Sequence, residues 1–194
     1  EARESQVPAL LEMLGIPYTG SGIVAQALSL DKALAKRVWR DHGLPTAPFQ
    51  VFVRGDEPLA PDLEFPLFVK PVREGSGMGI TPRSVVEDEE ALREQVRWVI
   101  RTYRQPALVE GFLPGREFTV GILGNRLWPG EAPPSPFYAP EGFHTFPVLE
   151  IDVSPIGDAG GLYTSQVKSD MPLAPRYLCP APIAEDLARE LQRL

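Results

Sequence analysis

A lysine at the end of an apolar run, followed closely by glycines, is the strongest chemical signal in the sequence. Residues 65–70 predict a strand that delivers Lys70 at its end, where Pro71 stops the hydrogen-bond ladder. Glycines let main-chain N–H groups approach a phosphate closely, and a lysine adds a positive charge to the same anion. The turn that would do this contains Gly75, Ser76, Gly77 and Gly79.

The same segment has a plain structural alternative, a tight hairpin with an exposed lysine. It is not a Walker A motif, because no glycine–lysine–serine/threonine sequence opens a helix, and no helix starts inside the glycines as a dinucleotide fingerprint requires. A hairpin would explain a single pair of glycines. The lysine, serine and three glycines together favour phosphate binding.

A second candidate segment crosses between two predicted strands, residues 107–109 and 118–123. Such a crossing would expose main-chain donors and acceptors beside apolar side chains, which suits the edge of a purine. Its carboxylates would then bind the purine amine and the ribose hydroxyls. The alternative is a short hairpin with surface acids. The residues concerned are Glu110, Gly111, Phe112, Leu113 and Glu117.

Two more lysines complete the set of candidate phosphate ligands. Lys32 stands in the first turn of a predicted helix, where a cation gains nothing from the helix dipole. Lys168 follows a proline-rich segment. Taken alone, each is explained equally well as a solvated surface lysine.

Hydrophobic spacing predicts the helices that position these residues. Residues 5–14 predict a short helix, a second helix begins near Leu30, and residues 182–194 predict a terminal helix. Ser84 and Glu87 predict a capping box for the longest helix. The expected buried stripe of the second helix is Leu30, Leu34 and Val38, and that of the longest helix is Leu92, Val96, Val99 and Tyr103.

The order of strands and helices predicts the fold class. Strands are expected at residues 49–53 and 65–70, then the longest helix, then the strands at 107–109 and 118–123. A pair of strands, a helix and another pair predict an α+β fold in which a helix covers an antiparallel sheet.

Proline is unusually frequent, with 22 in the chain, and seven of them fall between Pro129 and Pro155. Residues 128–161 therefore predict a long mobile loop, whose aromatic residues would close over a site as an apolar lid and exclude water. An irregular surface excursion explains the same composition.

Composition excludes several classes of protein. The chain has 194 residues, with 43% hydrophobic and 23% charged residues, which is ordinary for a globular protein. A net charge of −7 argues against nonspecific nucleic-acid binding, and no apolar run predicts a membrane span. The single cysteine, Cys179, cannot form an internal disulfide, and the sequence offers no metal-ligand cluster. We expect a cytoplasmic protein.

Taken together, these segments resemble the ATP-grasp superfamily and, within it, the D-alanine–D-alanine ligases. The matching residues cover nearly the whole chain in the right order: 11–22, 27–32, 65–71, 74–76 and 115–124. The resemblance implies ATP between two α+β lobes built from antiparallel sheets and helices. It also implies an amino-acid substrate, activated through an acyl phosphate in the synthesis of cell-wall (peptidoglycan) precursors, and a homodimer.

The resemblance assigns a role to each candidate residue. Lys32, Lys70 and Lys168 would hold ATP phosphates, and Gly75 and Ser76 belong to the glycine loop, with Ser76 as the catalytic residue facing the γ-phosphate. Phe68 would line the adenine pocket. The adenine would meet Glu110, Gly111, Phe112 and Leu113, and the ribose would meet Glu117.

Two positions depart from the ligase pattern. Gly77 stands where the ligases usually carry a second serine, and Ser169 stands where a tyrosine commonly follows the lysine. Both departures affect the expected D-alanine substrate more than ATP binding. The ligands for Mg²⁺ are expected beyond residue 194, so we expect a fragment, with a fold incomplete at its C-terminus, that is inactive by itself.

The resemblance also divides the chain. We expect a remnant of a substrate domain at residues 1–28, a central ATP-grasp lobe at 29–124 and part of a C-terminal lobe at 125–194. An ATP-dependent carboxylate–amine ligase is the first hypothesis. The alternatives are a nucleotide-binding module without catalysis and a structural fragment that neither binds nor reacts.

Overall fold

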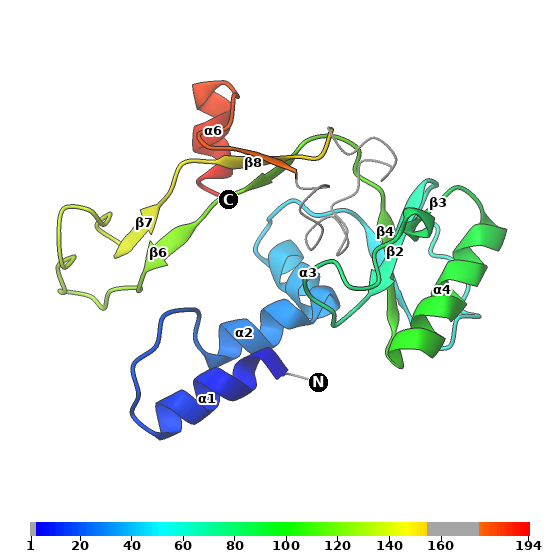
Figure 1. Cartoon of the computed structure of the whole chain (residues 1–194), viewed down its shortest axis with the longest axis horizontal. Helices are drawn as coiled ribbons and strands as arrows, with labels where there is room; N and C mark the ends of the chain where they lie inside the picture. The colour runs from blue at the N-terminus through cyan, green and yellow to red at the C-terminus, as the bar shows by residue number, and fades with distance from the viewer. Residues whose placement is uncertain (1–2, 155–174) are drawn as a thin grey trace. The chain divides into compact units, whose positions relative to one another are not determined.

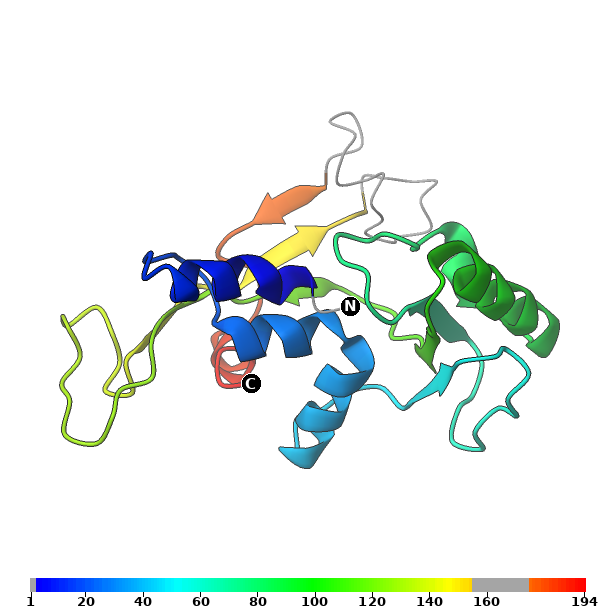
Figure 2. The ribbon, with the colours of Figure 1, turned by 90° about the horizontal axis from the view of Figure 1, so that it is seen from below.

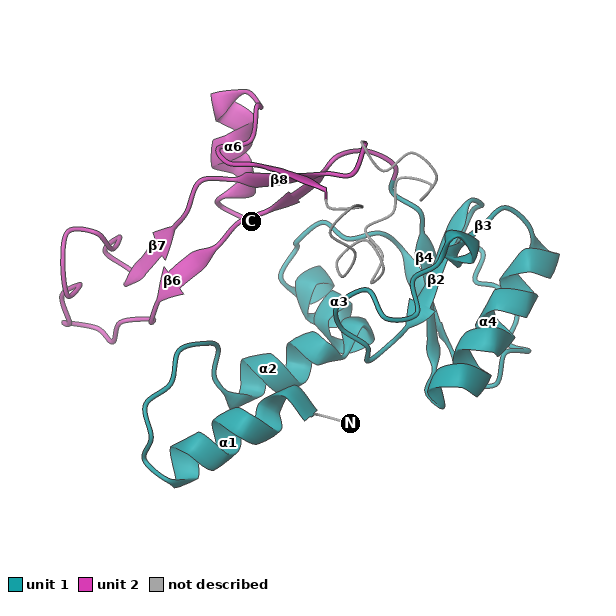
Figure 3. Ribbon diagram, viewed as in Figure 1, with its two compact units in different colours: residues 1–113, 162–171 teal, residues 114–161, 172–194 magenta. Residues whose placement is uncertain are grey.

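The computed structural model describes residues 3–154 and 175–194. It divides into two compact units: unit 1 contains the described residues up to Leu113, and unit 2 contains those from Pro114 onward (Figure 3). Both units are built from antiparallel strands and helices, so the predicted α+β class is confirmed. No helix in the described ranges is long and apolar enough to span a membrane.

Unit 1 is organised around one four-stranded antiparallel sheet in the order β1-β4-β2-β3. Opposite residues in its register include Phe49 with Glu110, and Glu110 with Phe68. The predicted strands at 49–53, 65–70 and 107–109 are confirmed, and β2 extends through Pro71. The strands are β1 (Phe49–Phe52), β2 (Leu67–Pro71), β3 (Val85–Val86) and β4 (Ala107–Gly111).

The longest helix, α4 (Glu89–Tyr103), covers one face of this sheet. Leu92, Val96 and Val99 are fully buried against the strands, as their spacing predicts, and Tyr103 packs at the margin of the same core. Figure 1 shows the sheet between α4 and α3 (Lys32–Asp41), so the two helices lie on opposite faces.

The start of α4 differs from the prediction. Asp88, not Ser84, caps the helix by accepting a hydrogen bond from the N–H of Ala91 at 2.8 Å. Ser84 is buried and instead completes the capping box that Thr81 begins in the short η2 (Pro82–Ser84). The prediction assigned Ser84 to the cap of α4 because it did not include the separate helical turn that ends at Ser84.

Helix α3 turns a different face to the sheet from the one predicted. Leu34 and Val38 are exposed, and the buried positions are Ala33, Ala35 and Lys36. The prediction chose the most apolar stripe, but the sheet opposite carries the carboxylate of Glu110, which pairs with the buried Lys36. Two more helices precede α3 and lie side by side (Figure 2): α1 (Gln6–Met13), which follows the short η1 (Arg3–Ser5), and α2 (Ile23–Leu30). The short helix predicted at 5–14 is confirmed, whereas α2 was not predicted.

Unit 2 contains two short sheets that follow one another along a long hairpin. The strand predicted at 118–123 is interrupted, and its halves do not join the sheet of unit 1. Thr119 lies opposite Leu149, but Ile122 lies opposite Thr145, so one extra residue is accommodated on the side that contains Pro147. Proline lacks an N–H, and an extra residue breaks the ladder as a β-bulge does.

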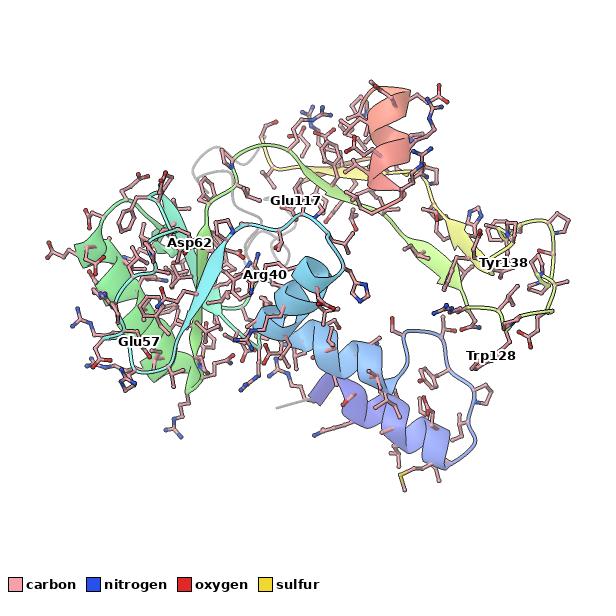
Figure 4. All side chains as sticks on the ribbon, turned by 180° about the vertical axis from the view of Figure 1, so that it is seen from behind. Arg40, Glu57, Asp62, Glu117, Trp128 and Tyr138 are labelled. Atoms are coloured by element: carbon pink, nitrogen blue, oxygen red, sulfur yellow. The ribbon has the colours of Figure 1, made fainter. Side chains whose placement is uncertain are left out.

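The strands of unit 2 also correct the prediction of a long loop at 128–161. Two strands lie within that range and pair with the preceding strands, and residues 155–161 lie outside the described ones. Figure 4 shows Trp128 and Tyr138 in the connection between the arms of the hairpin. Its elements are β5 (Glu117–Thr119), β6 (Ile122–Gly124), β7 (Phe143–Thr145), β8 (Leu149–Asp152), β9 (Arg176–Leu178) and α6 (Glu185–Leu191).

Candidate nucleotide site

The face of the sheet that α3 covers carries the candidate binding residues. Glu110 lies between Phe49 and Phe68 on the neighbouring strands. Because alternate residues of a strand share a face, Lys70 lies on the same side as Phe68. The structure therefore brings Phe68, Lys70 and Glu110 together, whereas the main apolar core packs on the α4 face.

Glu110 is the centre of an ion cluster. Its Oε2 accepts from the ammonium of Lys36 at 2.8 Å, and its Oε1 is paired with the ammonium of Lys70. The side chain of Glu110 is only 12% exposed. Burial alone would raise the pKa of this carboxyl, but the charges and hydrogen bonds of Lys70 and Lys36 hold the pKa below its usual value. Glu110 is therefore held as a carboxylate.

Lys32 begins α3 and points its ammonium at the main chain after β2. The group donates to the carbonyl oxygens of Pro71 and Val72, both at 3.4 Å, and to that of Glu74. Burial, and next the positive charge of Lys70, lower the pKa of Lys32 to about 8. An anion placed beside the two lysines would stabilise both charges.

The segment between Lys70 and the glycines is tied to the start of α3. Asp31 caps α3 by accepting from the N–H of Leu34 at 3.0 Å, and its second oxygen accepts from Arg73 at 2.8 Å. Glu74 accepts from Gln105 at 2.8 Å and pairs with Arg3 at 2.8 Å. These contacts hold the helix start and the strand end in one arrangement.

The glycine turn has the backbone geometry that its sequence predicts. Ser76, Gly77 and Gly79 all have positive φ, at 52°, 73° and 81°. A Cβ on Gly79 would lie 2.5 Å from Cγ of Pro71, so only glycine fits there. Gly75 is half-buried, and Ser76 is exposed at the surface of unit 1.

The end of β4 provides an aromatic surface but fewer main-chain donors than predicted. The rings of Phe68 and Phe112 stack at 6.1 Å with 21° between their planes. The N–H of Gly111 donates to Pro48, and that of Phe112 donates to Pro66, so neither is free for a purine. Leu113 is exposed. Recognition of a base through Gly111 or Phe112 would therefore not use their N–H groups.

The described structure does not place two of the predicted residues relative to this cluster. Glu117 belongs to unit 2, where it lies exposed in β5. Lys168 lies outside the described residues. In the part of the chain that is described, no three His, Cys, Asp or Glu side chains are grouped so that they could hold a metal ion.

The sequence prediction missed Lys36 and Asp31. Lys36 is 6% exposed and contacts Glu110, yet the predicted buried stripe of its helix did not include it. Its spacing contained the signal, because a residue four positions after Lys32 lies on the same helix face. Asp31 directly precedes the helix and is a favoured N-cap residue type.

Comparisons with known proteins identify the family of this chain. The family model described as D-ala D-ala ligase C-terminus matches residues 38–132. A D-alanine–D-alanine ligase of Nitrosococcus oceani is 43% identical over 125 residues, which are 63% of this chain and 38% of the relative. One of Ralstonia pickettii is 36% identical over 193 residues, 98% of this chain and 51% of the relative. The chain belongs to the D-alanine–D-alanine ligase family.

Membership of this family places the chain in the ATP-grasp superfamily, and the family uses ATP and Mg²⁺. A protein of Sinorhizobium fredii described as uncharacterized protein y4sG is also 36% identical, over 99% of this chain and 51% of the relative. Where nearly the whole of this chain is matched, it spans about half the length of the curated relative. The family model includes Lys70 and Glu110, whereas Lys32 precedes the matched range.

Proposed function

We propose that this chain carries the nucleotide-binding part of an ATP-dependent carboxylate–amine ligase of the D-alanine–D-alanine type, which makes a peptide bond for cell-wall precursors. One observation carries the proposal. Lys32 and Lys70 lie on one face of the sheet, beside a glycine turn, and the charge of one lowers the pKa of the other. Two cations that are close enough to repel each other are a suitable receptor for a polyphosphate.

The phosphate end of the site is the region around these lysines. In the proposed complex, the triphosphate replaces Glu110 as the partner of Lys70 and shares the ammonium of Lys32 with the main-chain carbonyls. Ser76 and Gly75 belong to the turn that would approach the terminal phosphate. ATP supplies the phosphoryl group that activates a carboxylate, and the protein contributes position and positive charge.

The base end is the aromatic surface beside Glu110. Phe68 and Phe112 offer a flat apolar surface for an adenine ring. Glu110 would accept from the adenine amine while it keeps its bond to Lys36, with Gly111 and Leu113 beside the base. The roles of Glu117 toward the ribose and of Lys168 toward the phosphates remain predictions.

The described residues include no group of three His, Cys, Asp or Glu side chains that could hold a metal ion. We therefore assign no magnesium ligand in this chain and derive no step through the metal. The predicted division of the chain, with residues 1–28 as part of a substrate domain, 29–124 as the central lobe and 125–194 as part of another lobe, also belongs to the proposal.

Calorimetric titration with ATP and Mg²⁺ tests this proposal. Wild-type protein should bind, and Lys70→Met should weaken binding at least tenfold. Arg101→Met removes one positive charge from the exposed end of α4, on the other face of the sheet, and should leave the affinity unchanged. Absence of binding by the wild type, or equal binding by Lys70→Met, would refute the nucleotide site.

A second measurement separates a ligase from a binding module. Phosphate release from ATP is followed with and without D-alanine. Stimulation by the amino acid supports the ligase. Binding of ATP without any release of phosphate would instead favour a module that binds nucleotide and does not react.

A further inference from the structure

Lys36 is a buried lysine whose charge is matched inside the protein. Its side chain is 7% exposed, and its ammonium contacts Oε2 of Glu110 at 2.8 Å and Oγ1 of Thr46 at 2.5 Å. The ring of Phe49 lies 5.3 Å from the same ammonium. A buried cation is costly unless it is paired and hydrogen-bonded, and these contacts meet that need.

Glu110 divides its two oxygens between two lysines of different exposure. The ammonium of Lys36 pairs with Oε2, and that of Lys70, whose side chain is 20% exposed, pairs with Oε1. The three groups together carry one excess positive charge. If Lys70 turns toward an anionic ligand, Glu110 still has Lys36 as its counter-charge. Without Lys36, the same movement would leave a carboxylate buried and unpaired, which is strongly unfavourable.

We propose that Lys36 is a positioning residue: it neutralises Glu110 and thereby allows Lys70 to leave that carboxylate for a polyphosphate. The inference rests on the proposed function, since it concerns the same site. Lys36 itself does not contact the ligand. Its influence on the ligand passes through Glu110, and this distinguishes it from Lys32 and Lys70.

Inorganic tripolyphosphate is the appropriate probe, because it carries the charge of the nucleotide tail and has no base to contact Glu110. Calorimetry should show that Lys36→Met weakens its binding at least tenfold. Glu110→Gln should tighten binding severalfold, since the carboxylate no longer competes for Lys70. In the Glu110→Gln background, Lys36→Met should change the affinity less than threefold, because no charge remains to be neutralised.

This double-mutant cycle distinguishes the positioning role from direct contact. If Lys36 bound the phosphate itself, its removal would cost the same factor in both backgrounds, and the inference would be overturned. Equal affinity of Lys36→Met and wild type would also overturn it. Lys36→Arg, which keeps the charge and can donate to both neighbours, should recover most of the wild-type affinity.

The outcomes also separate this inference from the proposed function. A wild-type protein that binds neither ATP nor tripolyphosphate overturns both. A wild-type protein that binds both, with no dependence on Lys36, overturns only the positioning role. If circular dichroism shows that Lys36→Met does not fold, Glu110→Gln and Lys36→Arg still test the positioning role of Lys36. Failure of Glu110→Gln to tighten binding contradicts the competition between Glu110 and the ligand.

Discussion

Replacing Asp31 tests how the start of α3 is held against the strand that ends at Lys70. One carboxylate oxygen caps α3 at the N–H of Leu34, and the other pairs with Arg73. Loss of an N-cap costs ~1 kcal/mol. Loss of this charge-assisted hydrogen bond costs about 1–2 kcal/mol, because Asp31 and Arg73 have side chains only 12% and 28% exposed. Asp31→Ala should therefore reduce the free energy of unfolding by about 2–3 kcal/mol.

Asp31→Asn is the matched control, since asparagine caps a helix about as well as aspartate but carries no charge. It should cost about 1 kcal/mol less than Asp31→Ala. Urea unfolding can be followed by tryptophan fluorescence in a Trp128→Phe background, where the remaining Trp39 and Trp98 both lie in unit 1. Equal stability of the two variants would refute the capping role, and wild-type stability of both would refute the whole account of this contact.

Two further predictions concern the segments around the sheet. The main-chain N–H groups of residues 53–55 lower the pKa of Glu57 to about 2, although burial alone would raise it. Glu57→Gln should lower the free energy of unfolding at neutral pH by about 1 kcal/mol, a value discounted for solvent screening. The difference between the variant and the wild type should disappear as the pH falls from about 4.5 to about 2. A difference that stays constant with pH in chemical unfolding would contradict this prediction. Gly79→Ala should destabilise by more than about 1 kcal/mol because of its positive φ and the contact with Pro71, whereas Gly75→Ala, which meets no atom within 4 Å, should change thermal stability little.

The sequence was most informative where one pattern determines one structure. Alternation in β2 predicts that Phe68 and Lys70 share a face, and the apolar spacing of α4 predicts its buried residues. The glycines after Lys70 predict the turn, and the structure shows why Gly79 is needed there. These features depend on local geometry, so a single segment contains the information.

The features that the sequence did not predict depend on residues that face them in the folded chain. α3 buries Lys36 because Glu110 faces it, and Glu110 is far away in the sequence. The strand at 118–123 is interrupted because the opposite chain contains Pro147 and one extra residue. Hydrophobic periodicity describes each segment by itself. It therefore predicted that the apolar side of α3 is buried and that the strand at 118–123 is continuous.

The central claim is that a polyphosphate binds between Lys32 and Lys70, and the lysine side chains report this directly. The chain has only four lysines, so their side-chain NMR signals can be resolved and assigned by substitution. Without ligand, Lys32 should titrate with a pKa of about 8. With saturating ATP, the adjacent negative charge should raise that pKa, and the signal of Lys70 should shift as well. Signals of both lysines that are unchanged by ATP, with the pKa of Lys32 still about 8, would contradict the account.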